Sequence, residues 1–177
     1  MITKIKRFFQ ETSGVSSIEA AIVFPIMVTM MIGTFDLGMA LMSNQKATRA
    51  AQMTADLLAR KAQLQSGDID DSIKAAELAL DPLPADKLGV DIVSISFDEL
   101  DKPYVVWRET YNMTPEDPDV VEDSFGLGTE GEGVLAVVVT YEHTPMFSAF
   151  ITGTITIREA SYFRGRKNAV VENENYL

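Results

Sequence analysis

The chain of 177 residues lacks cysteine and has a single histidine. The absence of cysteine excludes disulfide bonds and thiolate metal sites. No serine lies in a recognisable catalytic motif, and there is no glycine-rich loop of the kind that binds phosphates. His143 follows a predicted strand in a polar turn, a setting typical of a structural or solvent-exposed histidine. We therefore expect a protein that is not an enzyme, with no cofactor, no bound metal ion and no small-molecule substrate.

Basic residues are scarce beyond the amino terminus. The formal net charge is −11, yet the first 14 residues carry three basic side chains and only one acidic side chain. The rest of the chain carries 12 basic and 25 acidic side chains. Because an acidic body of this kind repels phosphate backbones, the charge balance argues against a nucleic-acid partner.

Residues 20–42 form a long apolar run with a single charge, Asp36. About 20 apolar residues are enough to span a bilayer as a helix. The basic cluster precedes this run, so the positive-inside rule predicts a cytoplasmic amino terminus and an extracytoplasmic remainder. Asp36 lies near the outer interface, where we expect its carboxylate to reach water rather than form a dedicated salt bridge. The sequence thus predicts a single-pass membrane protein.

Glu19 places a carboxylate at the start of the apolar run, where a charged group costs on the order of 3 kcal/mol. If the chain were cut after Gly14, the new α-amine of Val15 would lie at the same membrane depth. That amine and the Glu19 carboxylate of a neighbouring chain could then neutralise each other. The alternative is that Glu19 extends to the inner interface, and position alone leaves both readings open.

A basic leader that ends in glycine, followed by a segment whose fifth residue is glutamate and which continues as an apolar helix, resembles the type IV prepilin signature. Gly14 matches the residue before the cut, Val15 the new terminus and Glu19 the required glutamate. The resemblance implies that an inner-membrane prepilin peptidase removes residues 1–14 on the cytoplasmic side.

Within that superfamily the chain most resembles the TadE-like minor pseudopilins of tight-adherence (Tad) pili. Near the amino terminus, a glutamate followed by small residues and by a proline six positions after it is similar to their pattern: Glu19, Ala20, Ala21 and Pro25. The later stretch 133–166 is similar to theirs as well. The major pilin of these systems is much shorter and has an aromatic residue where this chain has Ala20. The resemblance therefore implies a minor subunit.

For such a subunit the resemblance implies a bacterial inner-membrane location, a periplasmic carboxy-terminal domain and possible incorporation into an extracellular pilus. The implied partners are the prepilin peptidase, other pilin or pseudopilin subunits and the pilus assembly machinery. The implied role is in pilus biogenesis, adhesion or surface attachment. Two alternatives stay open: a pseudopilin of a type II secretion system, which calcium near the carboxy terminus would favour, and an unprocessed signal-anchored periplasmic domain for binding or sensing.

The helical pattern continues beyond the apolar run. Small or apolar residues recur at steps of three and four along one face: Ala47, Ala51, Ala55, Leu58 and Ala62. The spacing predicts one helix over residues 15–64, with 15–42 in the membrane and 43–64 packed on the outer domain. Pro25, Gly33 and Gly38 interrupt its regularity and are candidate kinks.

Residues 65–166 are expected to form that outer domain. Asp68 is a candidate cap for a short helix over residues 69–80. Alternation of apolar and polar residues predicts strands at 93–97 and within 151–163. The aromatic and β-branched run at 104–111 and the run LAVVVTY within 134–141 predict two more. The predicted fold class is α+β and pilin-like, with the long transmembrane helix packed on a small four-stranded antiparallel sheet. The tail, residues 167–177, is expected to be flexible.

Two clusters of charged residues in this domain allow either a functional interpretation or a simple exposure to solvent. The loop over residues 112–133 is acidic enough to bind calcium, although a solvated loop is favoured; its carboxylates are Glu116, Asp117, Asp119, Glu122 and Asp123. Three basic residues, Arg164, Arg166 and Lys167, close the last predicted strand. A solvated strand end is the favoured reading for them over pairing with acidic neighbours or with another subunit.

Overall fold

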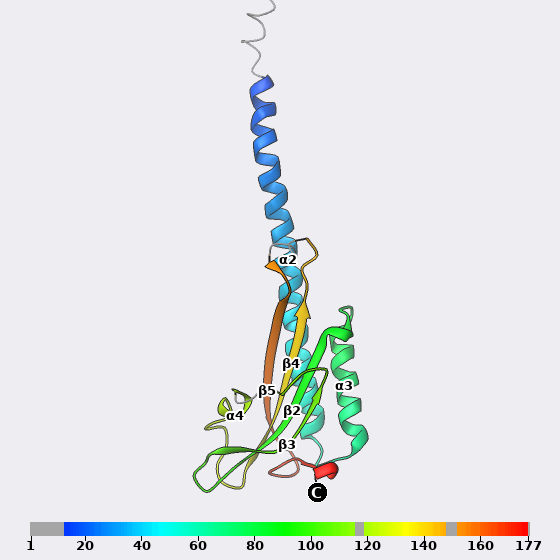
Figure 1. Ribbon diagram of the computed structural model, residues 1–177, viewed down its shortest axis with the longest axis vertical. Helices are drawn as coiled ribbons and strands as arrows, with labels where there is room; N and C mark the ends of the chain where they lie inside the picture. The colour runs from blue at the N-terminus through cyan, green and yellow to red at the C-terminus, as the bar shows by residue number, and fades with distance from the viewer. Residues whose placement is uncertain (1–12, 116–118, 148–151, 177) are drawn as a thin grey trace, which may run out of the picture.

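The computed structural model describes residues 13–115, 119–147 and 152–176. One long helix, α2 (Ser13–Ala59), runs out of a domain that contains a four-stranded antiparallel sheet and a shorter helix, α3 (Ser66–Leu80) (Figure 1). The carboxy-terminal half of α2 lies against the sheet, and the amino-terminal half projects beyond it. The predicted α+β fold, with an apolar helix on a four-stranded sheet, is confirmed.

The sheet has the strand order β3-β2-β4-β5, and every neighbouring pair is antiparallel. Its strands are β2 (Leu88–Phe97), β3 (Pro103–Tyr111), β4 (Gly133–His143) and β5 (Ile155–Arg164). Strand β2 begins five residues before the expected start at 93. The sequence did not predict this extension because it contains the charged Asp91. In the structure Asp91 is fully buried, and Arg108 of β3 donates to its carboxylate, with 2.9 Å between Nε and Oδ1.

The two faces of the sheet are covered differently. Val90, Ile92, Val137 and Val139 face the helices and belong to the main core with the buried side of α2 and α3. The opposite face holds a smaller cluster that includes Val93, Ile95 and Val138. Val120, from the short helix α4 (Asp119–Glu122), packs on that cluster. The docked half of α2 is therefore one layer of the principal core.

Helix α2 ends at Ala59, five residues earlier than expected. The amide of Lys61 bonds to the carbonyl of Leu58, and the amide of Arg166 bonds to the carbonyl of Ala59 at 2.9 Å. After the helix, the chain forms the short strand β1 (Gln63–Leu64). The expected helical stripe therefore holds from Ala47 to Leu58, and Ala62 lies outside the helix. The predicted end at residue 64 was wrong because the end of a helix depends on which groups donate hydrogen bonds to its last carbonyls, and the sequence pattern does not identify those donors.

Helix α3 begins at Ser66, and Asp68 lies inside its first turn. The amide of Gln65 donates to the Asp68 carboxylate at 3.1 Å, so Asp68 does stabilise the amino terminus, but from a position two residues into the helix. The predicted apolar face is confirmed: Ala76 and Leu80 are fully buried, and Ile69 is nearly so.

The expectation of a flexible tail is corrected by the structure. Strand β6 (Glu172–Asn173) pairs in parallel with β1, and a 3₁₀ turn (Glu174–Tyr176) follows. Val171 is buried, and its carbonyl accepts hydrogen bonds from the Trp107 indole at 2.7 Å and the Ser94 hydroxyl at 3.0 Å. The tail is polar in composition, yet one buried valine and its carbonyl are enough to fix it to the domain.

Candidate functional site

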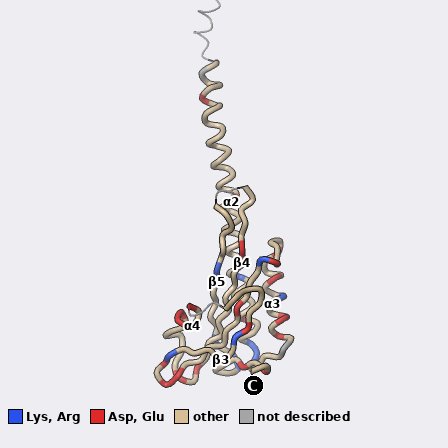
Figure 2. Tube along the Cα trace, viewed as in Figure 1, with Lys and Arg blue, Asp and Glu red and all other residues tan. Residues whose placement is uncertain are grey.

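The candidate site is the projecting half of α2, from Ser13 to Phe35. Its large apolar side chains are exposed, among them Ile22, Phe24 and Met30. Charged residues are concentrated on the domain and nearly absent from this half of the helix (Figure 2). Among the described residues, α2 is the one helix long and apolar enough to cross a membrane. An exposed apolar helix of this length indicates a membrane-anchored protein.

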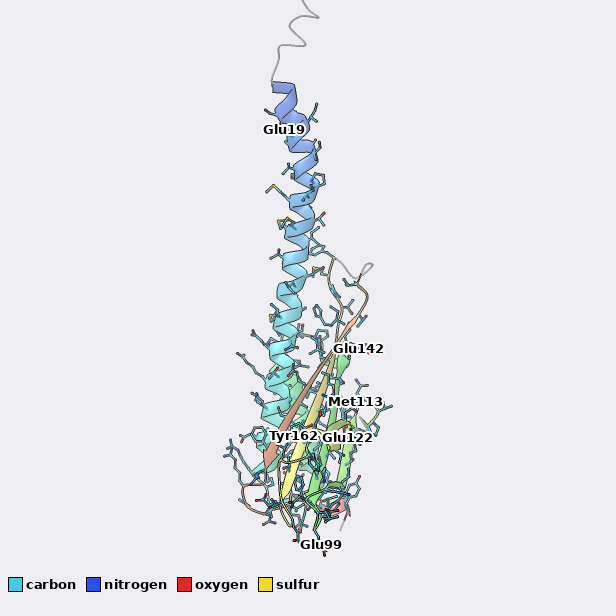
Figure 3. The ribbon with its side chains drawn as sticks, turned by 90° about the vertical axis from the view of Figure 1, so that its left-hand side faces the viewer. Glu19, Glu99, Met113, Glu122, Glu142 and Tyr162 are labelled. Atoms are coloured by element: carbon cyan, nitrogen blue, oxygen red, sulfur yellow. The ribbon has the colours of Figure 1, made fainter. Side chains whose placement is uncertain are left out.

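The residues of the predicted cleavage motif lie in the first two turns of this half. Gly14 and Val15 are both in the opening turn of α2, and residues 1–12 of the predicted leader lie outside the described residues. Glu19 is exposed on the helix (Figure 3). It lies one helical turn beyond Val15, a rise of about 6 Å. The helix thus holds the carboxylate and the predicted new terminus at neighbouring depths.

The three candidate kink positions lie within continuous helix. Pro25 is inside α2, and its carbonyl accepts a hydrogen bond from the Thr29 hydroxyl at 2.8 Å. A Cβ atom added at Gly33 or Gly38 would meet no other atom within 4 Å. The packing of the chain on itself therefore does not require glycine at either position. A kink at these residues stays a prediction.

Asp36 marks the point where the domain first meets the helix. Its side chain is 5% exposed, and the amides of Met146 and Phe147 in the β4–β5 loop donate to it at 3.2 and 3.3 Å. The rings of Phe35 and Phe147 meet edge to face, with centroids 5.7 Å apart. The expectation that Asp36 extends to water is therefore wrong. Sequence reasoning missed the loop because 110 residues separate the partners.

His143 is also placed at this junction. Its ring is 5% exposed, and Nδ1 lies 3.0 Å from the hydroxyl of Ser43, which in turn bonds to the carbonyl of Met39. Which of the two groups donates in the Ser43–His143 hydrogen bond depends on the tautomer of the imidazole ring. Burial is the main cause that lowers the pKa of His143; the Lys87 charge lowers it further, and the Asp36 charge opposes both. Of the two settings expected for this histidine, structural or solvent-exposed, the structure excludes the second, because the side chain is buried.

Below this junction, α2 meets the sheet through small residues. Ala47, Ala51 and Ala55 are fully buried, and Leu58 is 1% exposed. Small side chains allow the helix backbone to approach the strands closely. The predicted stripe is confirmed over this range, and it fixes the domain to the helix.

The two arginines at the end of β5, Arg164 and Arg166, are paired rather than simply solvated, which corrects the favoured reading for them. Arg166 forms an ion pair with Asp56 of α2, and Arg164 pairs with Glu132 at 3.1 Å. Arg60 donates to the same Asp56 carboxylate, and this hydrogen bond is the main cause that lowers the pKa of Asp56. These arginines remain more than half exposed, so their pairs are surface interactions.

The acidic loop contributes one short helix, α4, at Asp119–Glu122. Glu116, Asp117 and Pro118 lie outside the described residues. Within the described ranges, no group of three acidic or histidine side chains is placed so that it could hold a metal ion. Asp123 lies 4.0 Å from Arg158, at the limit of an ion pair. Calcium binding by the whole loop stays an untested alternative.

Comparison with known families finds a match that covers most of α2, in both its projecting and its docked half. The family model described as "TadE-like protein" matches residues 14–56. This match confirms the resemblance to TadE-like pilin-type proteins over that segment, which contains Gly14, Glu19 and most of the alanine stripe. Searches among curated proteins and among solved structures find no match.

Proposed function

We propose that this chain is a minor pilin or pseudopilin subunit of a Tad-type pilus, cleaved after Gly14 by a prepilin peptidase. In this role it is a non-catalytic building block that contributes to pilus biogenesis, adhesion or surface attachment. The observation that carries the proposal is the projecting half of α2, an exposed apolar helix that begins with the cleavage motif and lies in the segment matched by the TadE-like model.

The exposed surface of this helix suits two successive environments. In the membrane its large apolar side chains face lipid. In an assembly the same side chains pack against the helices of neighbouring subunits, and the open positions Gly33 and Gly38 let a neighbouring backbone approach. Among the described residues, Ile22, Phe24 and Met30 are more than 60% exposed, so this surface is open to lipid or to another helix. The geometry therefore supports a helix that exchanges lipid for other helices.

Glu19 supplies the specificity in this proposal. Cleavage after Gly14 frees the α-amine of Val15, whose pKa is near 8 in an unperturbed terminus. A Glu19 carboxylate and the amine of an adjacent subunit, at similar depths, neutralise each other and fix the axial register between subunits. The uncleaved chain has no such amine, which makes processing a condition for assembly.

The proposed orientation has the amino terminus in the cytoplasm and the domain in the periplasm of a bacterium with the helix in the inner membrane. The basic residues before α2 and the acidic domain after it support this orientation. The proposed partners are the membrane, the peptidase, other pilin-type subunits and the assembly machinery, with no role for nucleic acid.

The decisive experiment measures the amino-terminal sequence and intact mass of the membrane-extracted protein, with and without a cognate prepilin peptidase. We expect a mature chain beginning at Val15 only when the peptidase is active. Gly14→Leu should abolish processing without harming the fold, because a side chain at this position meets nothing within 4 Å.

Gly33→Ala is the matched control, since it also fills an open helical position but lies far from the cut. It should be processed as the natural chain is. A chain that still begins at Met1 beside an active cognate peptidase would contradict the proposal and favour a signal-anchored periplasmic domain.

Glu19→Gln separates processing from assembly. The exposed side chain contributes nothing to packing in the described chain, so the variant should fold and be cleaved normally. We expect it to lose most of its co-purification with other pilin-type subunits from membranes. Undiminished co-purification would remove Glu19 from the assembly mechanism.

A further inference from the structure

The position of Asp36 along α2 places part of the domain at the depth of the bilayer. A hydrocarbon core of about 30 Å takes about 20 helical residues at 1.5 Å each. Counted from the residue after Glu19, the core extends to about Met39. Asp36, and with it the first contact of the domain, then lies about 4.5 Å inside the outer boundary. This argument rests on the helix spanning a membrane.

The polar groups at this point satisfy one another. A carboxylate near hydrocarbon needs hydrogen-bond donors, and backbone amides of a loop near hydrocarbon need acceptors. The Asp36 carboxylate accepts from the amides of Met146 at 3.2 Å and Phe147 at 3.3 Å, and it is 95% buried by the helix and the loop. In water neither partner would require the other. At the edge of a bilayer this pairing offsets the desolvation cost of both the carboxylate and the loop amides.

The side chains around this pairing are apolar and uncovered. Met146 is 70% exposed, and Phe147 and Phe35 are 47% and 49% exposed although their rings touch. Strands β4 and β5 extend further along α2 than β2, β3 and α3 do (Figure 1), and Met146 and Phe147 just after β4 reach Asp36 at the start of the projecting half. The apolar surface of the helix therefore continues directly onto the loop.

We propose that Met146 and Phe147 insert into the outer boundary of the lipid bilayer, held there by Asp36 as a clamp on the loop backbone. The occupant of this surface is lipid, because the surface is continuous with the lipid-facing side chains of the projecting helix. The domain then stands on the membrane at two points, the helix and the loop. Because the docked half of α2 is part of the domain's core, two points of attachment limit the tilt of helix and domain together relative to the bilayer, which a single helix would leave free.

Spin labels test this placement, and the absence of cysteine makes single-site labelling clean. The full chain is reconstituted in vesicles of phosphatidylethanolamine and phosphatidylglycerol at a 3:1 ratio. A nitroxide is attached at Met146→Cys, at Ile26→Cys as a membrane reference and at Phe125→Cys as an exposed reference on the domain, just after α4. The measured quantity is collision with oxygen, which concentrates in lipid, relative to collision with a water-soluble nickel chelate.

We expect the oxygen-to-nickel ratio at residue 146 to approach that at residue 26 and to exceed that at residue 125 several-fold. A ratio at 146 equal to that at 125, with a lipid-like ratio at 26, would overturn the insertion while leaving membrane anchoring intact. A water-like ratio at residue 26 would overturn the premise of a spanning helix as well, so the two failures are distinguishable.

The clamp is tested by adding Asp36→Ala to the labelled variants. We expect the label at 146 to become several-fold more accessible to nickel, with no change at 26 and with unaltered fluorescence of the buried Trp107. An unchanged ratio at 146 in a folded variant would show that Asp36 does not hold the loop. Asp36→Asn keeps one acceptor oxygen and should give an intermediate ratio.

Discussion

Before Asp36, helix α2 carries large apolar side chains in open positions: Ile22, Phe24 and Met30 are 63%, 67% and 68% exposed. After Ser43, the buried side chains of the helix are mostly small, and Ala47, Ala51 and Ala55 are fully buried. The backbone is one uninterrupted helix through both halves. The difference teaches that local geometry and burial are set independently: the sequence makes both halves helical, and only the docked half is stabilised by the domain.

The largest expected effect comes from removing the one large side chain on the docked face. Leu58→Ala should lower the free energy of unfolding by about 3 kcal/mol, because Leu58 is 1% exposed and its loss leaves a cavity in the main core. Urea unfolding in detergent micelles, followed by Trp107 fluorescence, measures this loss.

Leu57→Ala is its matched control, since Leu57 is next in the same helix but 42% exposed. It should cost less than about 1 kcal/mol. Ile22→Ala, in the projecting half, should leave the unfolding of the domain unchanged. Equal losses at positions 57 and 58 would contradict the assignment of the docked face.

A second substitution adds volume instead of removing it. Ala51→Leu should lower the free energy of unfolding by about 1–3 kcal/mol, because the fully buried site leaves no room between helix and sheet. Ala21→Leu, at an exposed position of the projecting half, should change it by less than about 0.5 kcal/mol. The same urea titration compares them. A tolerated leucine at 51 would mean that the two halves do not differ in packing as described.

The smallest expected effect is a pH dependence confined to the junction of the two halves. Burial lowers the pKa of His143 below 6.5, so the folded state binds fewer protons than the unfolded state. Stability is therefore complete above about pH 6.5 and is lost as the pH falls toward the folded pKa. His143→Gln should remove this component from melting temperatures measured between pH 5 and 8. A steeper slope in the variant would contradict the sign.

Several features of the fold followed from local pattern. The length of the apolar run, the alanine stripe and the alternation in β2 each describe one element and its own face, so they predicted those elements and the fold class. The predicted cleavage motif is local too: Gly14, Val15 and Glu19 lie in the first two turns of α2, and the cleavage itself stays a prediction. The helix end at Ala59 and the early start of β2 escaped prediction because each depends on a distant partner, Arg166 and Arg108.

The sequence by itself determined a basic start, one membrane-length helix with Glu19 at its entrance, and a β-rich acidic domain. Only the tertiary structure decided how that domain is attached. Asp36 meets Phe147, Ser43 meets His143 and Asp56 meets Arg166, each across 100 or more residues. The physical reason is that the sequence reveals a charged or polar residue in a helix, whose burial costs free energy, but does not reveal the group that pairs with it. The partner is chosen by the strand order and by where the loops end.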